Sequence, residues 1–192
     1  VEQPPADSLT ARTYKPLLQP GLHKIIGFAR RTQGLIVAPG NPLALRSLAD
    51  VARTGARFVN RPLGSGTRVL LDDLLAQAGI ASDVIPGYAH NEPSHTAIAE
   101  AVAAGAADVG MGIELAARAR GLGFVPLVHE RYHLACLKTS LDQPPTLALR
   151  QWLQTPEWLA QMAALPGYAP WHCGEVLAMS AVLPWWQFAR KK

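Results

Sequence analysis

The stretch from Asn60 to Arg68, which reads NRPLGSGTR, constrains the fold of this chain more than any other part of its sequence. The apolar run before it, residues 56–59, is typical of a short buried strand, and the helical pattern after it extends to about Ala78. Two glycines in the stretch let the backbone turn tightly and come close to a ligand. A strand, a glycine loop and a helix in this order form one unit of an α/β fold.

The same loop offers the groups of an anion-binding site. Ser65 and Thr67 place hydroxyl groups beside the N–H groups of the helix start, which have no acceptor inside the helix. This end of a helix carries positive partial charge, so Arg68 is unfavourable there unless an anion lies nearby. Two interpretations are open at this point: an oxyanion site, or an ordinary strand–turn–helix with a solvated Arg68.

Composition limits the classes of function. The 192 residues are 49% hydrophobic and 17% charged, which is typical of a globular chain with one large domain or two small lobes. The formal net charge is only +4, and part of it comes from the last three residues, 190–192. Because no helical pattern is basic and no basic and aromatic residues alternate, we expect DNA contact only through a domain outside this chain.

Cysteine spacing and hydropathy bear on the cellular location. Cys136 and Cys173 are too far apart for a metal or redox motif, which favours two reduced cysteines in a cytoplasmic protein. No apolar run reaches the length that spans a membrane, and the first residues do not read as a signal peptide. We therefore expect a cytoplasmic protein without membrane contact.

The chain alternates between strand and helix patterns, which predicts an α/β fold with a mainly parallel sheet. On the helix after the glycine loop, Asp72 and Asp73 are expected to face away from the apolar side. Strands or extended segments are predicted at residues 24–29, 35–38, 56–59, 84–88, 108–113 and 124–138. Further helices are predicted at 48–53, 95–104, 114–120, 145–154 and 156–165, with residues 1–21 irregular.

Three stretches carry a family resemblance: GLIVAPGNPLALRSLADVARTGARFVNRPLGSGTR, SHTAIAEAVAAGAADVGMGI and GLGFVPLVHERYHLACLK. Together they resemble the PBP-like effector domain, a relative of the periplasmic binding proteins. Such domains occur behind DNA-binding helix-turn-helix domains or fused to molybdopterin-biosynthesis proteins. The resemblance covers about residues 22–170 and implies a type II periplasmic-binding-protein-like α/β fold with two lobes and a ligand cleft between them.

The resemblance also implies a division of the chain. Residues 1–43 and 124–192 are expected to form lobe I, and residues 44–123 lobe II, with extended crossings near Pro39–Pro42 and Val125–Tyr132. Family members have a further βαβ unit before the equivalent of Tyr14, and this sequence starts without it. We therefore expect a fragment of a longer protein, or an incomplete lobe I.

The ligand class that the resemblance implies is a small oxyanion, with molybdate or tungstate the usual suggestion. Glu114 is open to two interpretations, since it either holds Arg68 in place or favours the start of its own helix, and we favour the second. His95 either donates to the anion or is a surface histidine near a helix cap. The predicted ligand-binding residues are Asn60, Arg61, Gly64, Ser65, Gly66, Thr67, Arg68, Ser94, His95, Thr96 and Glu114.

We therefore predict the ligand-sensing effector domain of a bacterial transcriptional regulator. Neither a nucleophile–base pair nor a carboxylate pair stands out, and Gly64–Gly66 matches neither a nucleophile elbow nor a P-loop, so we expect no enzyme. Two alternatives are open: a solute-binding protein for anion uptake, and a domain attached to a molybdopterin-biosynthesis enzyme. A signal peptide in the complete gene would favour the solute-binding protein. A homodimer is also left open.

Two further features have alternatives. His129 to His133 spell HExxH, but the residues around them are typical of a strand, on which four positions span about 13 Å, too far for two ligands of one zinc ion. We expect neither a metal site nor a cofactor. Trp171, Trp185 and Trp186 form either a partner surface or a tail packed on the domain, and large aromatic side chains favour the packed tail.

Overall fold

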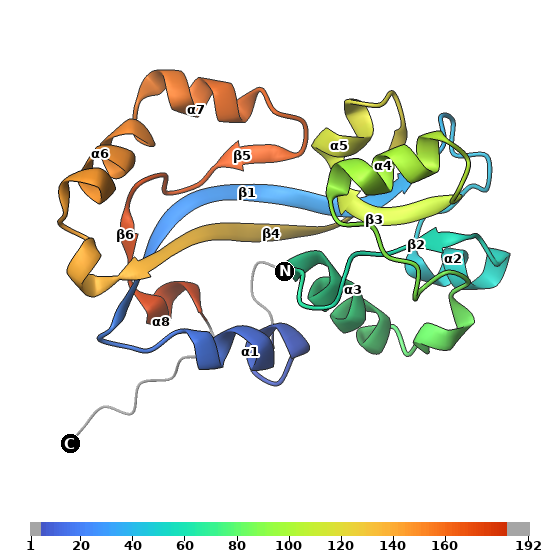
Figure 1. Ribbon diagram of the computed structural model, residues 1–192, viewed down its shortest axis with the longest axis horizontal. Helices are drawn as coiled ribbons and strands as arrows, with labels where there is room; N and C mark the ends of the chain where they lie inside the picture. Colours follow the sequence, from blue (N-terminus) through green and yellow to red (C-terminus); the bar gives the residue numbers. More distant parts are fainter. Residues whose placement is uncertain (1–4, 184–192) are drawn as a thin grey trace. The chain divides into compact units, whose positions relative to one another are not determined.

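The computed structural model describes residues 5–183, and within them the chain divides into two compact units (Figure 1). Unit 1 contains the described residues up to Arg31 and from His129 onward, and unit 2 contains Thr32–Val128. Two long strands, β1 (His23–Val37) and β4 (Gly123–Leu137), continue from one unit into the other. The sequence placed the lobe boundaries at 43/44 and 123/124, and this division into units does not test them, so they stay a prediction.

The sheet has the strand order β2-β3-β1-β4, with β5 and β6 also paired to β1. The prediction of a mainly parallel sheet is wrong for the pairs of known register, because β1 runs antiparallel to β3, β5 and β6. Only β2 (Phe58–Val59) and β3 (Val109–Ile113) form a parallel pair among these. Alternation of strands and helices predicts parallel pairing only between strands that one helical crossover joins, and β1 has no such link to its neighbours.

The strands predicted at residues 24–29 and 35–38 are parts of one strand, β1. The polar and glycine residues between them interrupt the apolar pattern without interrupting the strand. Gly34 is needed there, because a Cβ at this position would overlap the carbonyl oxygen of Val125 and approach the Cα of Pro126. A glycine that weakens the sequence signal for a strand thus allows a close approach to β4.

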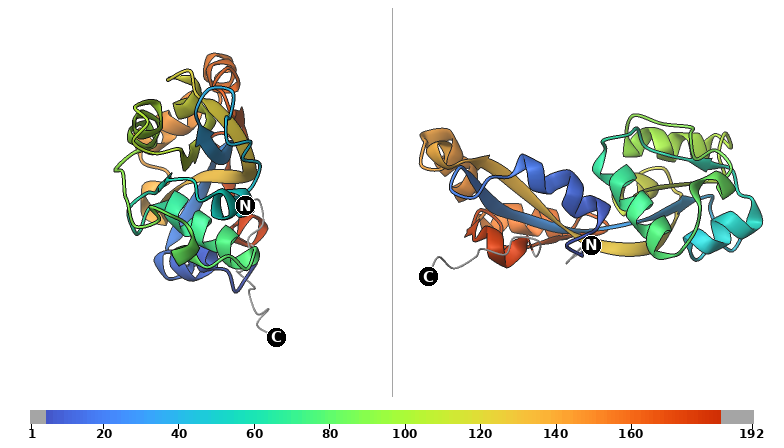
Figure 2. Two further views of the ribbon diagram at one scale, coloured as in Figure 1. Left: turned by 90° about the vertical axis from the view of Figure 1, so that its right-hand side faces the viewer. Right: turned by 90° about the horizontal axis from the view of Figure 1, so that it is seen from below.

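Unit 2 packs helices on both sides of its strands. Ile36 of β1 belongs to a buried cluster with Ile98 and Ala99 of α4 and Ala117 of α5. Figure 1 shows α4 and α5 on one side of β3 and α2 and α3 on the other, and Figure 2 gives two further views of these helices. The helices of the unit are α2 (Leu48–Thr54), α3 (Gly66–Gln77), α4 (His95–Ala103) and α5 (Glu114–Arg118).

Three of these helices begin directly after a serine. The hydroxyl oxygens of Ser47, Ser65 and Ser94 accept hydrogen bonds from the backbone N–H three residues later, at 3.2, 3.3 and 3.0 Å. Each serine has the extended backbone of an N-cap. The predicted starts of α2 at residue 48 and of α4 at residue 95 are therefore confirmed, and α3 begins inside the stretch from Asn60 to Arg68 that was expected to open it.

The strand predicted at residues 84–88 is wrong. A short 3-10 helix, Ser82–Val84, is followed by a turn in which Gly87 has a φ of +84°. Pro86 nevertheless lies beside β2, since its carbonyl oxygen accepts a hydrogen bond of 2.7 Å from the N–H of Phe58. Val, Ile and Tyr residues favour a strand locally, but the Pro86-Gly87 pair ends extended structure.

The two acidic residues of α3 do not face solvent together as predicted. Asp73 is buried, with 5% of its surface exposed, and the side chain of Asp72 is 23% exposed. The helix is covered by the sheet on one side, and on another Tyr88 donates a hydrogen bond to Asp72. An amphipathic pattern assumes a single covered side, which does not hold for α3.

Unit 1 contains the remaining elements of the described chain. The prediction that residues 1–21 are irregular is wrong in part, because Ser8 caps a short helix, α1 (Leu9–Tyr14). Trp171 packs against a cluster that includes Met179 and Val182, which fits the packed tail, whereas Trp185 and Trp186 lie outside the described residues. The other elements are α6 (Pro144–Trp152), α7 (Pro156–Ala163), β5 (Tyr168–Pro170), β6 (Val176–Leu177), α8 (Met179–Val182) and the 3-10 turns Lys15–Leu17 and Lys138–Ser140.

Candidate functional site

The carboxyl ends of β2 and β3 bring most of the predicted site residues to one edge of the sheet. The two strands are parallel, with Phe58 opposite Val109 and Val59 opposite Gly110. The glycine loop therefore leaves β2 at the same edge at which α5 begins directly after β3. In α/β proteins this edge is where loops and helix starts form ligand sites. We call it the carboxyl edge: residues 60–68, 91–96 and 113–114.

Hydrogen bonds join the loop before α3 to the segment before α4. The backbone N–H of Asn60 donates to the carbonyl oxygen of His90 at 2.7 Å, and its side-chain amide donates to that of Tyr88 at 3.0 Å. The guanidinium of Arg61 donates to the carbonyl oxygen of Pro93 at 2.9 Å. Asn60 is buried and serves this framework, while Arg61 is partly exposed.

The starts of α3 and α4 carry the predicted hydroxyls and backbone donors. Ser65 and Ser94 use their hydroxyl oxygens as caps, so the N–H groups of the third helical residues are occupied. The N–H groups of Gly66, Thr67 and Thr96 precede these positions, and helix geometry gives them no acceptor in their own helix. Gly64, Gly66 and Thr96 are exposed, whereas the side chain of Thr67 is buried.

Arg68 is not the solvated arginine of the simpler interpretation, because only 8% of its side chain is exposed. Its Nε lies 3.1 Å from a carboxylate oxygen of Asp72, and its guanidinium carbon lies 4.1 Å from the ring centre of Tyr88. Tyr88 donates to the same carboxylate at 2.5 Å, and burial with this carboxylate raises the pKa of Tyr88. Arg68 also reaches the carbonyl oxygen of Arg61 at 3.4 Å and the amide oxygen of Asn91 at 3.5 Å. The side chain thus ties α3 to both loops.

Glu114 and His95 lie at the same edge in different settings. Glu114 forms an ion pair of 3.0 Å with Arg118 and lies in the first turn of α5, which is the position that the second interpretation expects. His95 is partly buried, and its Nδ1 lies 3.3 Å from where a Cβ on Gly112 would be. His95 therefore borders the end of β3 from the start of α4.

Three residues of this region were missed by sequence reasoning. Asp72 could have been found, since an acid four positions after Arg68 is an ion-pair signal on a helix. Tyr88 gives no such signal, because its position beside α3 depends on the path of the preceding turn. Gln33 of β1 is completely buried opposite Ile113, and it carries no sequence signal, because it ends a polar run, residues 30–33, between the two apolar parts of the strand.

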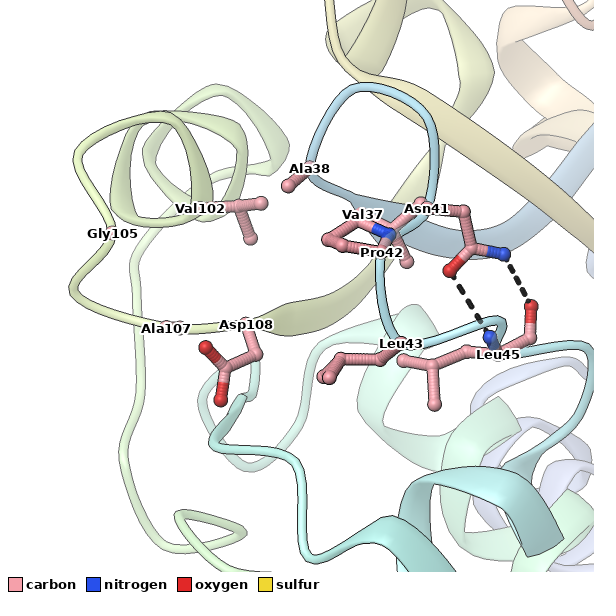
Figure 3. A pocket seen from close by; sticks show the side chains of 10 residues that line it. All are labelled: Val37, Ala38, Asn41, Pro42, Leu43, Leu45, Val102, Gly105, Ala107 and Asp108. Atoms are coloured by element: carbon pink, nitrogen blue, oxygen red, sulfur yellow. Dashed lines mark hydrogen bonds between the residues drawn. The ribbon is translucent and has the colours of Figure 1, made fainter.

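A pocket of about 220 Å³ lies at the other end of β3 (Figure 3). It is mostly apolar, and its polar side chains are engaged: Asn41 makes two hydrogen bonds with the backbone of Leu45, and Asp108 pairs with Arg57 at 2.7 Å. Because these groups are already satisfied, the pocket offers little to orient a polar ligand. The carboxyl edge remains the stronger candidate.

The HExxH residues lie on β4, so the predicted strand at this motif is confirmed. Within residues 5–183 no group of three or more His, Cys, Asp or Glu side chains is placed to hold a metal ion. His129 is exposed and His133 partly buried on this strand. Among the helices of the described chain, none is long and apolar enough to cross a membrane.

The stability of the protein is expected to fall in mild acid because of His133. Burial, together with the nearby charge of Arg131, lowers the pKa of His133 to about 4 from an ordinary value of 6.5. As the pH falls, the unfolded chain protonates this histidine before the folded chain does. The contribution of the neutral, buried His133 to the free energy of unfolding is therefore complete above pH 6.5 and is lost as the pH falls towards 4. With allowance for partial exposure, we expect a loss of about 1–2 kcal/mol, measured by urea unfolding across this range.

A variant pair isolates the effect. His133→Gln should flatten the dependence of unfolding free energy on pH, and His90→Gln, at an exposed position, should leave it as in the parent. If both variants keep the slope of the parent, His133 does not cause it.

Comparisons with known proteins agree with this fold. A family model described as a PBP superfamily domain matches residues 3–154. The uncharacterized protein YvgK of Bacillus subtilis (strain 168) is 33% identical over 153 residues, which cover 80% of this chain and 49% of YvgK. The chain therefore spans about half the length of this curated relative.

Two solved structures show the same architecture at low identity. The regulatory domain of CcmR from Synechocystis PCC6803, in complex with 2-PG, is 16% identical with a TM-score of 0.58, covering 78% of this chain and 72% of that one. PEB3 of Campylobacter jejuni, bound to L-phospholactate, is 16% identical with a TM-score of 0.58, covering 77% of this chain and 69% of that one. The predicted periplasmic-binding-protein-like α/β fold is confirmed.

Proposed function

This chain belongs to the PBP superfamily, and from that membership we propose that it is the ligand-sensing domain of a bacterial transcriptional regulator that binds a small anion. The observation that carries the proposal is the pair of helix starts at the carboxyl edge. The loops before α3 and α4 are hydrogen-bonded to each other, and both helices begin at serine caps. Two adjacent helix starts present backbone donors and positive partial charge to an anion.

The site is proposed to use backbone donors more than a charged side chain. Arg68 is engaged with Asp72, so its charge is balanced within the protein. The donors are then the N–H groups of Gly66, Thr67 and Thr96, with Arg61 and His95 adding side-chain groups at the same edge. Such a site suits binding, and we propose no catalysis for it.

Two structural neighbours support the class of ligand. They were solved with 2-PG and with L-phospholactate, and the latter is a phosphorylated hydroxy acid. Molybdate and tungstate stay in the proposal as small oxyanions. We also propose a cytoplasmic location and DNA contact through another domain of the complete protein.

Titration calorimetry of the chain tests the proposal. The panel contains molybdate, tungstate, sulfate, inorganic phosphate, phosphoglycolate, lactate and, as a neutral ligand, glucose. We expect binding of at least one anion and none of glucose. Binding of glucose without a response to any anion would sink the proposal.

Gly66→Pro is expected to weaken anion binding without unfolding the protein. Gly66 is the first residue of α3, where proline fits the helix but removes the N–H donor, and Ser65 already has the extended backbone that precedes proline. α6 and α7 begin with proline in this way. A lost hydrogen bond to a charged group corresponds to roughly a tenfold to hundredfold lower affinity, measured by calorimetry.

Gly66→Ala is the matched control, because it adds a Cβ and keeps the N–H. We expect it to bind the anion like the parent and to be slightly more stable, since alanine favours a helix over glycine. Equal affinity of the alanine and proline variants would remove the Gly66 N–H from the site.

A further inference from the structure

Gln33 on β1 is a polar side chain in an environment that leaves it unsatisfied. Its exposed fraction is 0%, and within the described part of the chain neither its amide oxygen nor its amide nitrogen has a hydrogen-bond partner. A buried amide without partners destabilises a fold, and such groups are rare in native proteins. A bound ligand that forms hydrogen bonds with this amide would remove the cost.

The register of the sheet places Gln33 at the carboxyl edge. It lies opposite Ile113, which is the last residue of β3 and the N-cap of α5. Leu35, two positions further along the same strand, is completely buried opposite Met111 and lies farther from this edge. Gln33 is thus at the row of the sheet where the helices of the candidate site begin.

The alternation of β1 places Gln33 on the side of the sheet that faces α3. Successive side chains of a strand point to opposite faces. Ile36 packs with α4 and α5, so Gln33, three positions away, lies on the other face. Figure 1 shows α3 on that side of β3, and α3 begins at Gly66 at the carboxyl edge.

We infer that Gln33 is a ligand-binding residue of the anion site, and that the ligand is a small anion which also carries an O–H group. This inference rests on the proposed function. The helix starts only donate hydrogen bonds, and so does the amide nitrogen of Gln33. The amide oxygen only accepts, so it is satisfied by a ligand with a donor.

This donor requirement separates two classes of oxyanion. Molybdate, tungstate and sulfate are fully deprotonated at neutral pH and offer acceptors alone. Inorganic phosphate keeps a proton at neutral pH, and a 2-hydroxy acid carries a hydroxyl beside its carboxylate. The bare oxyanions leave the oxygen of Gln33 facing negative charge, whereas the second class pairs with it.

Matched pairs of ligands test the inference on the unmodified chain. Calorimetry compares inorganic phosphate with sulfate, and lactate with propionate. We expect the member with the O–H group to bind at least about tenfold more tightly in at least one pair, because a site that hydrogen-bonds a hydroxyl rejects the analogue that lacks it.

Gln33→Met removes both hydrogen-bonding groups at nearly constant length. We expect it to lose that tenfold preference while its unliganded melting temperature rises or stays level, because no unsatisfied amide remains. Gln77→Met, at an exposed position near the end of α3, is the control and should keep the preference.

The outcomes separate this inference from the proposed function. If the parent binds anions without a preference for the O–H member, or if Gln33→Met keeps the preference, the role of Gln33 is wrong and the anion site stands. If the parent binds none of the anions, the proposed function fails together with the inference. If Gln33→Met does not fold, the preference of the parent decides.

Discussion

Gly87→Ala is expected to lower the free energy of unfolding by about 3–5 kcal/mol. Gly87 has a φ of +84°, which strains any residue with a Cβ, and that Cβ would overlap the carbonyl oxygen of Phe58. The turn cannot move away easily, because Pro86 accepts a hydrogen bond from Phe58 and the following residues hold Asn60. Urea unfolding followed by circular dichroism measures the loss.

Gly64→Ala is the matched control for this change. Gly64 has nearly the same φ, +85°, but a Cβ there meets nothing within 4 Å. Only the backbone strain remains, so we expect a loss of about 1 kcal/mol. Equal losses at the two glycines would show that contact with Phe58 does not matter.

Arg68→Ala is expected to destabilise the protein by about 2–4 kcal/mol. The change removes the ion pair with Asp72 and the contact with the Tyr88 ring, and it leaves the carboxylate partly buried beside a tyrosine. A first-turn arginine opposes the helix dipole, and that argument by itself leads to the opposite expectation, that the fold tolerates the loss of Arg68. Thermal unfolding of both proteins separates the two expectations.

Arg118→Ala provides a comparison at the same spacing. Arg118 also pairs with an acid four positions away, at 3.0 Å, but its side chain is 52% exposed. We expect a loss of no more than about 1 kcal/mol, as for other surface pairs. If Arg68→Ala is as mild as Arg118→Ala, the buried network contributes little to stability, and Arg68 becomes available again as a ligand residue.

Local chemistry explains which parts of the fold could be predicted. The serines at 47, 65 and 94 cap helices through hydrogen bonds three residues away, and such contacts can be read from sequence. The strand at the HExxH residues was also predictable, because the apolar pattern around them extends over fifteen residues of β4.

The errors arise where distant segments decide the structure. The turn at Gly87 lies beside β2 without being a strand, and local propensity does not contain that pairing. Asp73 was expected to face solvent because the pattern of α3 shows one apolar side, while the structure buries it. The antiparallel neighbours of β1 were missed because register is a property of pairs of strands.

The candidate site divides in the same way. Its backbone parts, the caps and glycines of the loop before α3, were predictable because they depend on nearest neighbours in sequence. Its side-chain parts were not, since the contacts of Arg68 involve Tyr88 and Asn91 from a loop twenty or more positions away. Gln33 joins the site only through the pairing of β1 with β3.

β1 passes without interruption from the residues of unit 1 into those of unit 2, and this has a consequence for how the protein can change in length. A strand keeps its inward and outward sides only if residues are added or removed two at a time. A single insertion within β1 would therefore exchange Gln33 and Leu35 with Gly34 and Ile36 between the faces of the sheet, unless a bulge absorbed it. Loops such as residues 38–45 have no alternation of faces to preserve. Evolution can therefore lengthen or shorten them one residue at a time while this strand keeps its length.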